Sequence, residues 1–203
     1  MVINFDMKTI ILASASPRRK ELLEKIGFKF DVDASDCEGE INSELEPHKL
    51  VRQISIKKAK SVAVRHKNAL IIAADTIGVI GNKILGKPHT ENEARKMLHE
   101  ISGKSHLVIT GFTVLDTATN KILSRTVNTK VYIKKLTKQE IDAYVKTGEP
   151  MDKAGAYAIQ GRGAVIVEKI EGDYYNVMGL PLNALAEALK EFGINVWGHT
   201  PSK

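Results

Sequence analysis

The apolar positions of the chain alternate between strand-like runs and helix-like rows. Residues 10–13 form an apolar run that predicts a strand, and residues 69–74 form a longer continuous run, the pattern of a strand that is covered on both faces. Between them, Leu50, Ile54 and Val62 are spaced by fours and eights, which predicts one buried face of a long helix. This alternation of strands and helices favours an α/β fold.

Local start and stop signals place the remaining elements. Ser16-Pro17 begins a helix that Gly27 ends, and capping boxes at Thr90 and Thr137 open two more. Further helices are expected from residue 47 onward and over 181–193, and strands over 28–32, 77–80, 83–85, 107–116, 122–134 and 164–170. We therefore expect an α/β fold with a mixed twisted sheet, flanking helices and two lobes around a central cleft. Residues 1–197 are expected to form this single domain, and residues 198–203 a polar C-terminal tail.

Two charged residues interrupt these apolar patterns. Asp75 directly follows six apolar residues, so the strand is expected to end at Asp75-Thr76, and the carboxyl ends of strands carry the chemistry of many α/β proteins. A carboxylate there is either a turn residue or a general base and metal ligand. Lys58 falls in the buried row of the long helix, so it must snorkel outward or meet an anion.

The turn from Ser14 to Arg19 places two cations where a bare helix disfavours them. With Ser16 as N-cap and Pro17 as the first helical residue, Arg18 and Arg19 lie at the positive end of the helix dipole, at a cost of roughly 0.3–1 kcal/mol each. A bound phosphate or polyphosphate would turn this cost into a stabilisation, because it accepts hydrogen bonds from the N–H groups, the serine hydroxyls and both guanidiniums. The alternative is two solvated arginines.

Two further segments offer polar side chains to a ligand. Residues 81–88 nearly match the P-loop motif, but Pro88 stands where that motif has the hydroxyl that binds Mg²⁺. Only Lys87 remains as a possible phosphate contact. The glycine-rich segment 152–163 carries Lys153 and Gln160, and it is either a close approach to a ligand or a tight turn. Gln160 has both a donor and an acceptor, which suits a base edge.

Composition bounds the classes of function. The chain has 203 residues, 43% hydrophobic and 27% charged, and its 30 Lys and Arg against 24 Asp and Glu suit an anionic ligand without identifying one. No apolar run reaches the length of a membrane helix, and the first eight residues lack the features of a signal peptide. The single cysteine, Cys37, allows no intramolecular disulfide. We therefore expect a cytoplasmic protein with no membrane and no stable nucleic-acid partner.

In this order, the motifs resemble the Maf family of nucleoside triphosphate pyrophosphatases over nearly the whole chain. The matching segments are 14–19, 74–76, 86–88, 102–103, 152–157 and 172–181. The resemblance implies a fold shared with inosine triphosphatases, a nucleoside triphosphate substrate and a homodimer. It implies metal-assisted attack of water that cleaves between the α and β phosphates, releasing nucleoside monophosphate and pyrophosphate.

The resemblance also implies roles for individual residues. Asp75 becomes the proton acceptor, and Ser14, Arg19, Lys58 and Lys87 become phosphate or catalytic contacts. Arg18, Thr76 and Gln160 match the positions that mark the branch similar to dTTP/UTP pyrophosphatases, and Lys153 is assigned to substrate binding.

For the metal, the resemblance implies Asp75 together with a glutamate of the acidic loop. Here Glu38-Gly39-Glu40 interrupts the usual Glu-Glu pair, and Glu38 aligns without a gap, with Glu40 as the alternative. Mg²⁺ is the expected ion and Mn²⁺ the alternative, because a hard cation prefers few carboxylates plus phosphate oxygens and water.

The sequence leaves two other functions open. One is a pyrophosphatase of 7-methyl-GTP or another modified nucleotide, although that branch has tryptophan and glutamine where this chain has Arg18 and Thr76. The other is a nucleotide-binding regulator of septum formation, which would not need a base such as Asp75.

Overall fold

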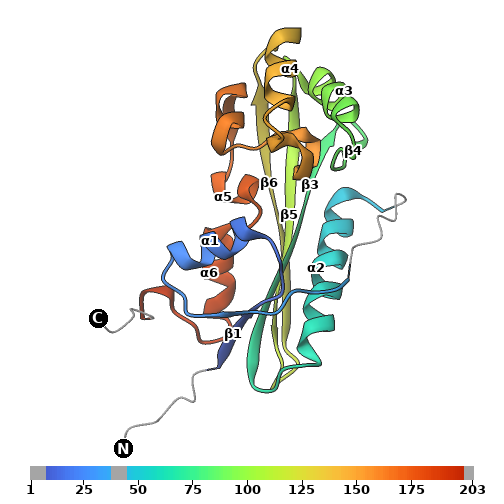
Figure 1. The fold of residues 1–203 in the computed structure, drawn as a ribbon. Helices are drawn as coiled ribbons and strands as arrows, with labels where there is room; N and C mark the ends of the chain where they lie inside the picture. Colours follow the sequence, from blue (N-terminus) through green and yellow to red (C-terminus); the bar gives the residue numbers. More distant parts are fainter. Residues whose placement is uncertain (1–7, 38–44, 199–203) are drawn as a thin grey trace, which may run out of the picture.

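The computed structural model describes residues 8–37 and 45–198, and these build one seven-stranded sheet with helices on both faces (Figure 1). The strand order is β2-β1-β3-β5-β6-β7, with β4 added on β3. The strands are β1 (Thr9–Leu12), β2 (Asp31–Val32), β3 (Ala69–Ile80), β4 (Lys83–Leu85), β5 (Ser105–Asp116), β6 (Ile122–Ile133) and β7 (Val167–Glu171). β1 is parallel to β2 and β3, whereas the other pairs are antiparallel, so the predicted mixed sheet is confirmed.

The helices gather at the two ends of the long strands β3, β5 and β6. They are α1 (Pro17–Lys25), α2 (Pro47–Ala63), α3 (Glu91–Ile101), α4 (Lys138–Val145), α5 (Tyr174–Met178) and α6 (Leu182–Lys190). In Figure 1, α1 and α6 cover one face of the sheet and α2 the other, while α3 and α4 lie at the opposite end of the strands. None of the helices in the described part of the chain is both long and apolar enough to cross a membrane.

Alternating residues of β3 explain why its sequence is continuously apolar. Leu70 and Ile72 pack into a core with residues of α1 and α6, whereas Ile71 and Ala73 pack with Ala59 of α2. Because side chains alternate across a strand, a strand covered on both faces needs apolar residues at every position. The prediction for residues 69–74 is therefore confirmed.

Both threonines cap their helices, but the glutamate three residues later binds differently in the two caps. Thr137 makes the complete capping box with Glu140 that the sequence predicts. Thr90 accepts from the backbone N–H of Glu93, but the Glu93 carboxylate accepts from the N–H of His89 instead of that of Thr90. The capping box predicted at Thr137 is therefore confirmed, whereas the one predicted at Thr90 forms only in half.

Strand β3 does not end at Asp75, which corrects the sequence prediction. It continues to Ile80 and pairs with β5 through residues 70–79. On its other edge, β1 pairs with residues 69–72 and β4 with residues 78–80. Within the described chain, residues 73–77 have no strand partner on that edge. This gap admits the polar pair Asp75-Thr76 inside a strand without burying it in the sheet.

Other element boundaries also differ from those expected. The strand expected over 28–32 shrinks to β2, because β1 is only four residues long and its last two residues pair with Asp31 and Val32. The segment 152–163 becomes a series of 3-10 turns, η1 (Glu149–Asp152), η2 (Ala154–Ala156) and η3 (Gly161–Ile166), and η3 takes the first half of the strand expected over 164–170. The short helix α5 was not predicted.

Candidate active site in the edge gap of strand β3

A pocket of about 1120 Å³ opens at the gap in the β3 edge. Its walls come from the turn between β1 and α1, the middle of β3, the loop after β4, the 3-10 turns after α4 and the end of α5. Nine of the ten predicted site residues line it: Ser14, Arg18, Arg19, Lys58, Asp75, Thr76, Lys87, Lys153 and Gln160. The tenth, Glu38, and its alternative Glu40 lie outside the described residues.

Asp75 faces helix α2, where it meets Lys58. The Lys58 Nζ lies 2.6 Å from the Asp75 Oδ1, and each side chain is less than one-fifth exposed. Lys58 therefore meets an anion inside the fold instead of snorkelling away from it, and the anion is the candidate base itself. The pair fixes both side chains at the rim of the pocket.

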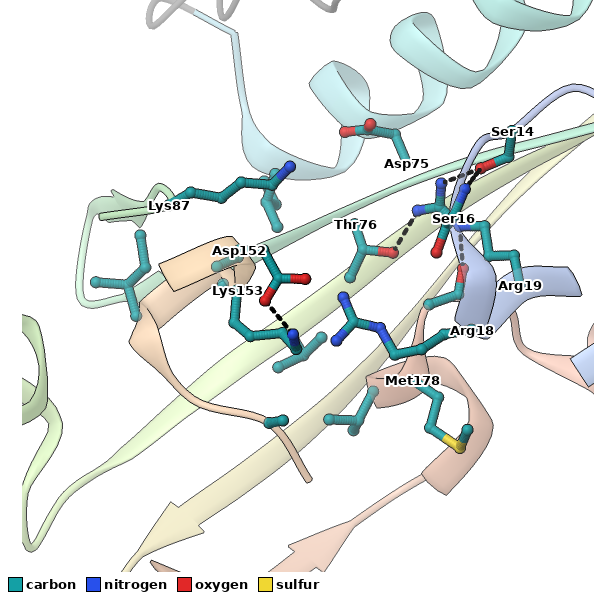
Figure 2. A pocket seen from close by; sticks show the side chains of 18 of the residues that line it. Ser14, Ser16, Arg18, Arg19, Asp75, Thr76, Lys87, Asp152, Lys153 and Met178 are labelled. Atoms are coloured by element: carbon teal, nitrogen blue, oxygen red, sulfur yellow. Dashed lines mark hydrogen bonds and ion pairs between the residues drawn. The ribbon is translucent and has the colours of Figure 1, made fainter. Parts of the chain in front are cut away.

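The Arg19 side chain lines the pocket and donates hydrogen bonds only to neutral acceptors (Figure 2). Its Nε donates to the Gly179 carbonyl over 2.8 Å, Nη1 to the Ser14 Oγ over 3.1 Å and Nη2 to the Thr76 Oγ1 over 3.1 Å. Burial lowers the pKa of Arg19, the charge of Asp75 opposes this, and Arg18 adds to it. No carboxylate in the described chain forms an ion pair with this partly buried cation, so an anion in the pocket would stabilise it.

The helix start is as predicted, but its serines act differently. Helix α1 begins at Pro17 with Ser16 as N-cap, yet the Ser16 side chain makes no cap hydrogen bond. Instead the Ser14 Oγ accepts from the Ser16 N–H over 3.3 Å as well as from Arg19. The alternative of two solvated arginines is wrong for Arg19.

Three more cations face the pocket in different ways. Arg18 and Lys87 form no hydrogen bond or ion pair with the residues that the structure describes, so both are available to an anionic ligand. Lys153 forms an ion pair with Asp152, and its side chain is 15% exposed. Figure 2 shows Arg18 pointing towards the Asp152–Lys153 pair from across the pocket.

The two faces of β3 give the pocket two different sides. Asp75 and Lys58 lie on the α2 face, and Lys87 lines the pocket near them. Thr76 points to the other face, where apolar side chains line the wall: Val108, Tyr157, Ile159 and Met178. Because cations border the pocket and apolar side chains form part of its wall, the pocket suits a ligand with an anionic end and a flat apolar end.

Sequence reasoning missed a carboxylate that holds the Gln160 loop. Glu149 accepts from the backbone N–H groups of Arg162 and Gly163 over 3.0 and 2.8 Å, and from the Tyr144 hydroxyl over 2.8 Å. Burial raises the pKa of Glu149, but these three donors outweigh it, so the pKa is lowered. A glutamate that lies thirteen and fourteen residues before the N–H groups it binds gives no local sequence signal.

His106 and Tyr157 form a second unpredicted pair in the pocket wall. The His106 Nε2 lies 2.8 Å from the Tyr157 hydroxyl, and the His106 Nδ1 is buried without a partner among the described residues. Burial lowers the pKa of His106 to about 4 and raises that of Tyr157. Both rings are therefore neutral near pH 7 and add no charge to the apolar side.

The chain is similar to known proteins over most of its length. The family model described as Maf-like protein matches residues 9–192. The chain is 52% identical to a dTTP/UTP pyrophosphatase of Methanococcoides burtonii over 94% of this chain and 98% of that protein. It is also 52% identical to a dTTP/UTP pyrophosphatase of Alkaliphilus metalliredigens over 94% of this chain and 100% of that protein.

A solved structure shares the fold at low sequence identity. The HAM1 protein from Coxiella burnetii superposes with a TM-score of 0.54 and is 17% identical, covering 91% of this chain and all of that one. The likeness supports the α/β architecture described above. The family model spans most of the chain, and two relatives are about half identical to it over nearly their whole length. The chain therefore belongs to the Maf-like protein family.

Proposed function

We propose that this protein is a nucleoside triphosphate pyrophosphatase that acts on dTTP and UTP. The reaction adds water between the α and β phosphates and yields nucleoside monophosphate and pyrophosphate. The observation that carries the proposal is the gap in β3, where the carboxylate of Asp75 faces a pocket lined by cations. Relatives that are about half identical over their whole length carry the name dTTP/UTP pyrophosphatase, which supports the choice of substrates.

The triphosphate lies against the cationic groups in this proposal. Arg19 is partly buried without a carboxylate ion-pair partner in the described chain, and Lys87 is exposed at the opposite end of the gap. A triphosphate that spans the gap contacts both, with Ser14 beside Arg19. Positioned cations stabilise the charge that develops on the departing pyrophosphate.

Asp75 accepts the proton of the attacking water. The water oxygen forms the new bond to the α phosphorus, the bond from that phosphorus to the bridging oxygen breaks, and pyrophosphate carries away the electron pair. Lys58 donates to the Asp75 Oδ1 over 2.6 Å, which leaves the other carboxylate oxygen for the water. Lys58 thus orients the base, and no covalent intermediate is needed.

The donor set suits a hard divalent cation. Asp75 offers carboxylate oxygen, and the described residues contain no cluster of three His, Cys, Asp or Glu side chains that would form a complete metal site. Mg²⁺ commonly binds through one or two carboxylates plus substrate phosphates, with Mn²⁺ as the alternative here. In the proposal Asp75 would hold the ion with Glu38. When bound, the ion neutralises charge on the triphosphate.

The apolar side of the pocket holds the base in this proposal. Thr76 and Gln160 offer hydrogen bonds to its edge, and Arg18 and Lys153 border the same space. The family resemblance supports this assignment, because Arg18, Thr76 and Gln160 match the positions that mark the dTTP/UTP branch. The resemblance also supports a homodimer, a cytoplasmic location and a single two-lobed domain formed by residues 1–197. Light scattering of the purified protein tests the homodimer.

The test is a panel of nucleoside triphosphates with Mg²⁺, with pyrophosphate and orthophosphate measured separately. We expect equimolar pyrophosphate and monophosphate from UTP and dTTP, and a loss of at least about 100-fold in kcat for Asp75→Asn. Asp31→Asn, an exposed aspartate on β2, is the matched control and keeps full activity. Release of orthophosphate alone, or full activity in Asp75→Asn, contradicts the proposal.

The branch assignment has its own experiment. Arg18→Trp combined with Thr76→Gln introduces the residues of the 7-methyl-GTP branch, so preference is expected to move from UTP towards 7-methyl-GTP. An unchanged pyrimidine preference argues against base recognition by these two positions.

A further inference from the structure

A line of hydrogen bonds runs from Arg19 through two threonines to helix α5. The Arg19 Nη2 donates to the Thr76 Oγ1 over 3.1 Å, the Thr76 and Thr110 hydroxyl oxygens lie 2.9 Å apart, and the Thr110 Oγ1 donates to the Asn176 carbonyl over 2.9 Å. Thr76 on β3 and Thr110 on β5 are paired across the sheet. Thr110 is completely buried, so no solvent competes for its hydroxyl.

The two ends of this line fix the direction of every proton in it. A guanidinium can only donate and a carbonyl oxygen can only accept. If the Thr110 proton pointed to Thr76 instead, lone pairs of the Thr110 and Asn176 oxygens would face each other at 2.9 Å in a buried place, which is unfavourable. Thr110 therefore donates to Asn176, Thr76 donates to Thr110, and Thr76 accepts from Arg19.

We infer that Thr110 is a positioning residue that makes the Thr76 hydroxyl a pure acceptor towards the pocket. The single proton of Thr76 is used on Thr110, so only a lone pair remains for a ligand. Where it faces the ring nitrogen N3 of a pyrimidine, such an acceptor selects a base that carries a proton on that nitrogen. This inference rests on the proposed function, in which Thr76 contacts the base.

The inferred selection separates the pyrimidines. Uracil and thymine carry a proton on N3, whereas cytosine has a bare lone pair on the same ring nitrogen. A hydroxyl that is free to rotate satisfies either base, because it both donates and accepts. A hydroxyl that faces N3 with its proton fixed elsewhere accepts from uracil or thymine, whereas with cytosine it leaves two lone pairs facing each other.

Thr110→Val tests the inference, because valine keeps the shape and removes the hydroxyl. We expect the ratio of kcat/KM for UTP to that for CTP to fall by about 3- to 10-fold, the worth of one hydrogen bond. Thr113→Val is the matched control: Thr113 is also fully buried on β5, but it bonds Ser55 and Ser124, away from Thr76. Thr110→Ser keeps a hydroxyl at this position and is expected to keep the UTP to CTP ratio of the unaltered protein.

A role through Thr76 also predicts non-additivity. In a Thr76→Val background, Thr110→Val is expected to leave the UTP to CTP ratio unchanged, because there is no hydroxyl left to orient. Equal losses for UTP and CTP in Thr110→Val, or an equal effect in both backgrounds, overturn the inference and indicate a merely structural threonine. Absence of pyrophosphate release from UTP and dTTP by the unaltered protein overturns the proposed function instead.

A substrate pair gives a result that does not depend on the folding of any variant. N3-methyl-UTP lacks the ring N–H, whereas 5-methyl-UTP carries the same extra methyl group and keeps it. For the unaltered protein we expect kcat/KM to be at least about 10-fold lower for N3-methyl-UTP than for 5-methyl-UTP. Equal values for the two substrates overturn the inference.

Discussion

Glu149 offers the sharpest test of how the fold holds the base-binding side of the pocket. Its carboxylate accepts from the N–H groups of Arg162 and Gly163 and from the Tyr144 hydroxyl. These bonds enclose the loop that carries Gln160, and the Tyr144 hydroxyl also accepts from the Ala158 N–H over 3.2 Å. Glu149→Gln keeps the size of the side chain while it replaces one acceptor oxygen by an NH₂ donor.

The cost of this change follows from the three bonds. Hydrogen bonds to a charged acceptor contribute about 1.5–3 kcal/mol each, and neutral ones about 0.5–1.5 kcal/mol. In the glutamine variant, the oxygen shared by Gly163 and Tyr144 becomes a neutral acceptor, and the new NH₂ faces the N–H of Arg162. Because Arg162 is exposed, water can take its N–H, so we expect a loss of about 2–4 kcal/mol in the free energy of unfolding.

Denaturant unfolding and steady-state kinetics measure the two consequences. The free energy of unfolding is expected to fall, and KM for UTP to rise with a smaller change in kcat, because Gln160 loses its support. Glu168→Gln removes the same charge from an exposed position with no hydrogen bond or ion pair in the described chain, and it is the control. Unchanged stability and unchanged KM in Glu149→Gln would refute the reasoning.

Acid adds a second readout for the same carboxylate. The pKa of Glu149 is lowered in the folded protein, so its contribution to stability is fully present above the unfolded-state pKa of about 4.3 and is lost as the pH falls through the folded pKa. Glutamine does not titrate. The stability difference between the unaltered protein and Glu149→Gln should therefore shrink below about pH 4.3.

Three further predictions test other parts of the fold and the site. Burial lowers the pKa of His106 to about 4, whereas the unfolded chain has the ordinary histidine pKa of about 6.5. As the pH falls from about 6.5 to about 4, the unfolded chain binds more protons and the folded protein loses about 3 kcal/mol of stability. His106→Phe should flatten that part of the stability–pH curve, which urea unfolding measures. Gly111→Ala places a Cβ 2.5 Å from the Val51 carbonyl and should cost about 3 kcal/mol of unfolding free energy, whereas Gly86→Ala, with no atom within 4 Å, should leave thermal unfolding unchanged. Arg19→Lys cannot reach three acceptors at once and should lower kcat/KM for UTP by about 10- to 100-fold, so near-normal kinetics would contradict the role of the guanidinium.

Several elements could be predicted because their signals are local or periodic. The threonine caps, the glycine that ends α1 and the buried row of α2 depend on residues within a few positions of one another. The resemblance over ordered motifs also named nine side chains that line one pocket. Even so, periodicity alone misplaced the end of β3, because a polar pair after six apolar residues reads as the end of a strand.

The sequence by itself determined the α/β class, most helices and the family. Only the tertiary structure decided how the site is built, because its contacts join residues far apart in the chain. Lys58 meets Asp75 from another element, Arg19 reaches Gly179 across 160 positions, and Thr110 orients Thr76 across two paired strands. The site exists where β1 stops and β4 has not begun, and the length and register of neighbouring strands decide that gap. Hydrophobic pattern fixes which face of a strand is buried, whereas the position of an open edge depends on its partners.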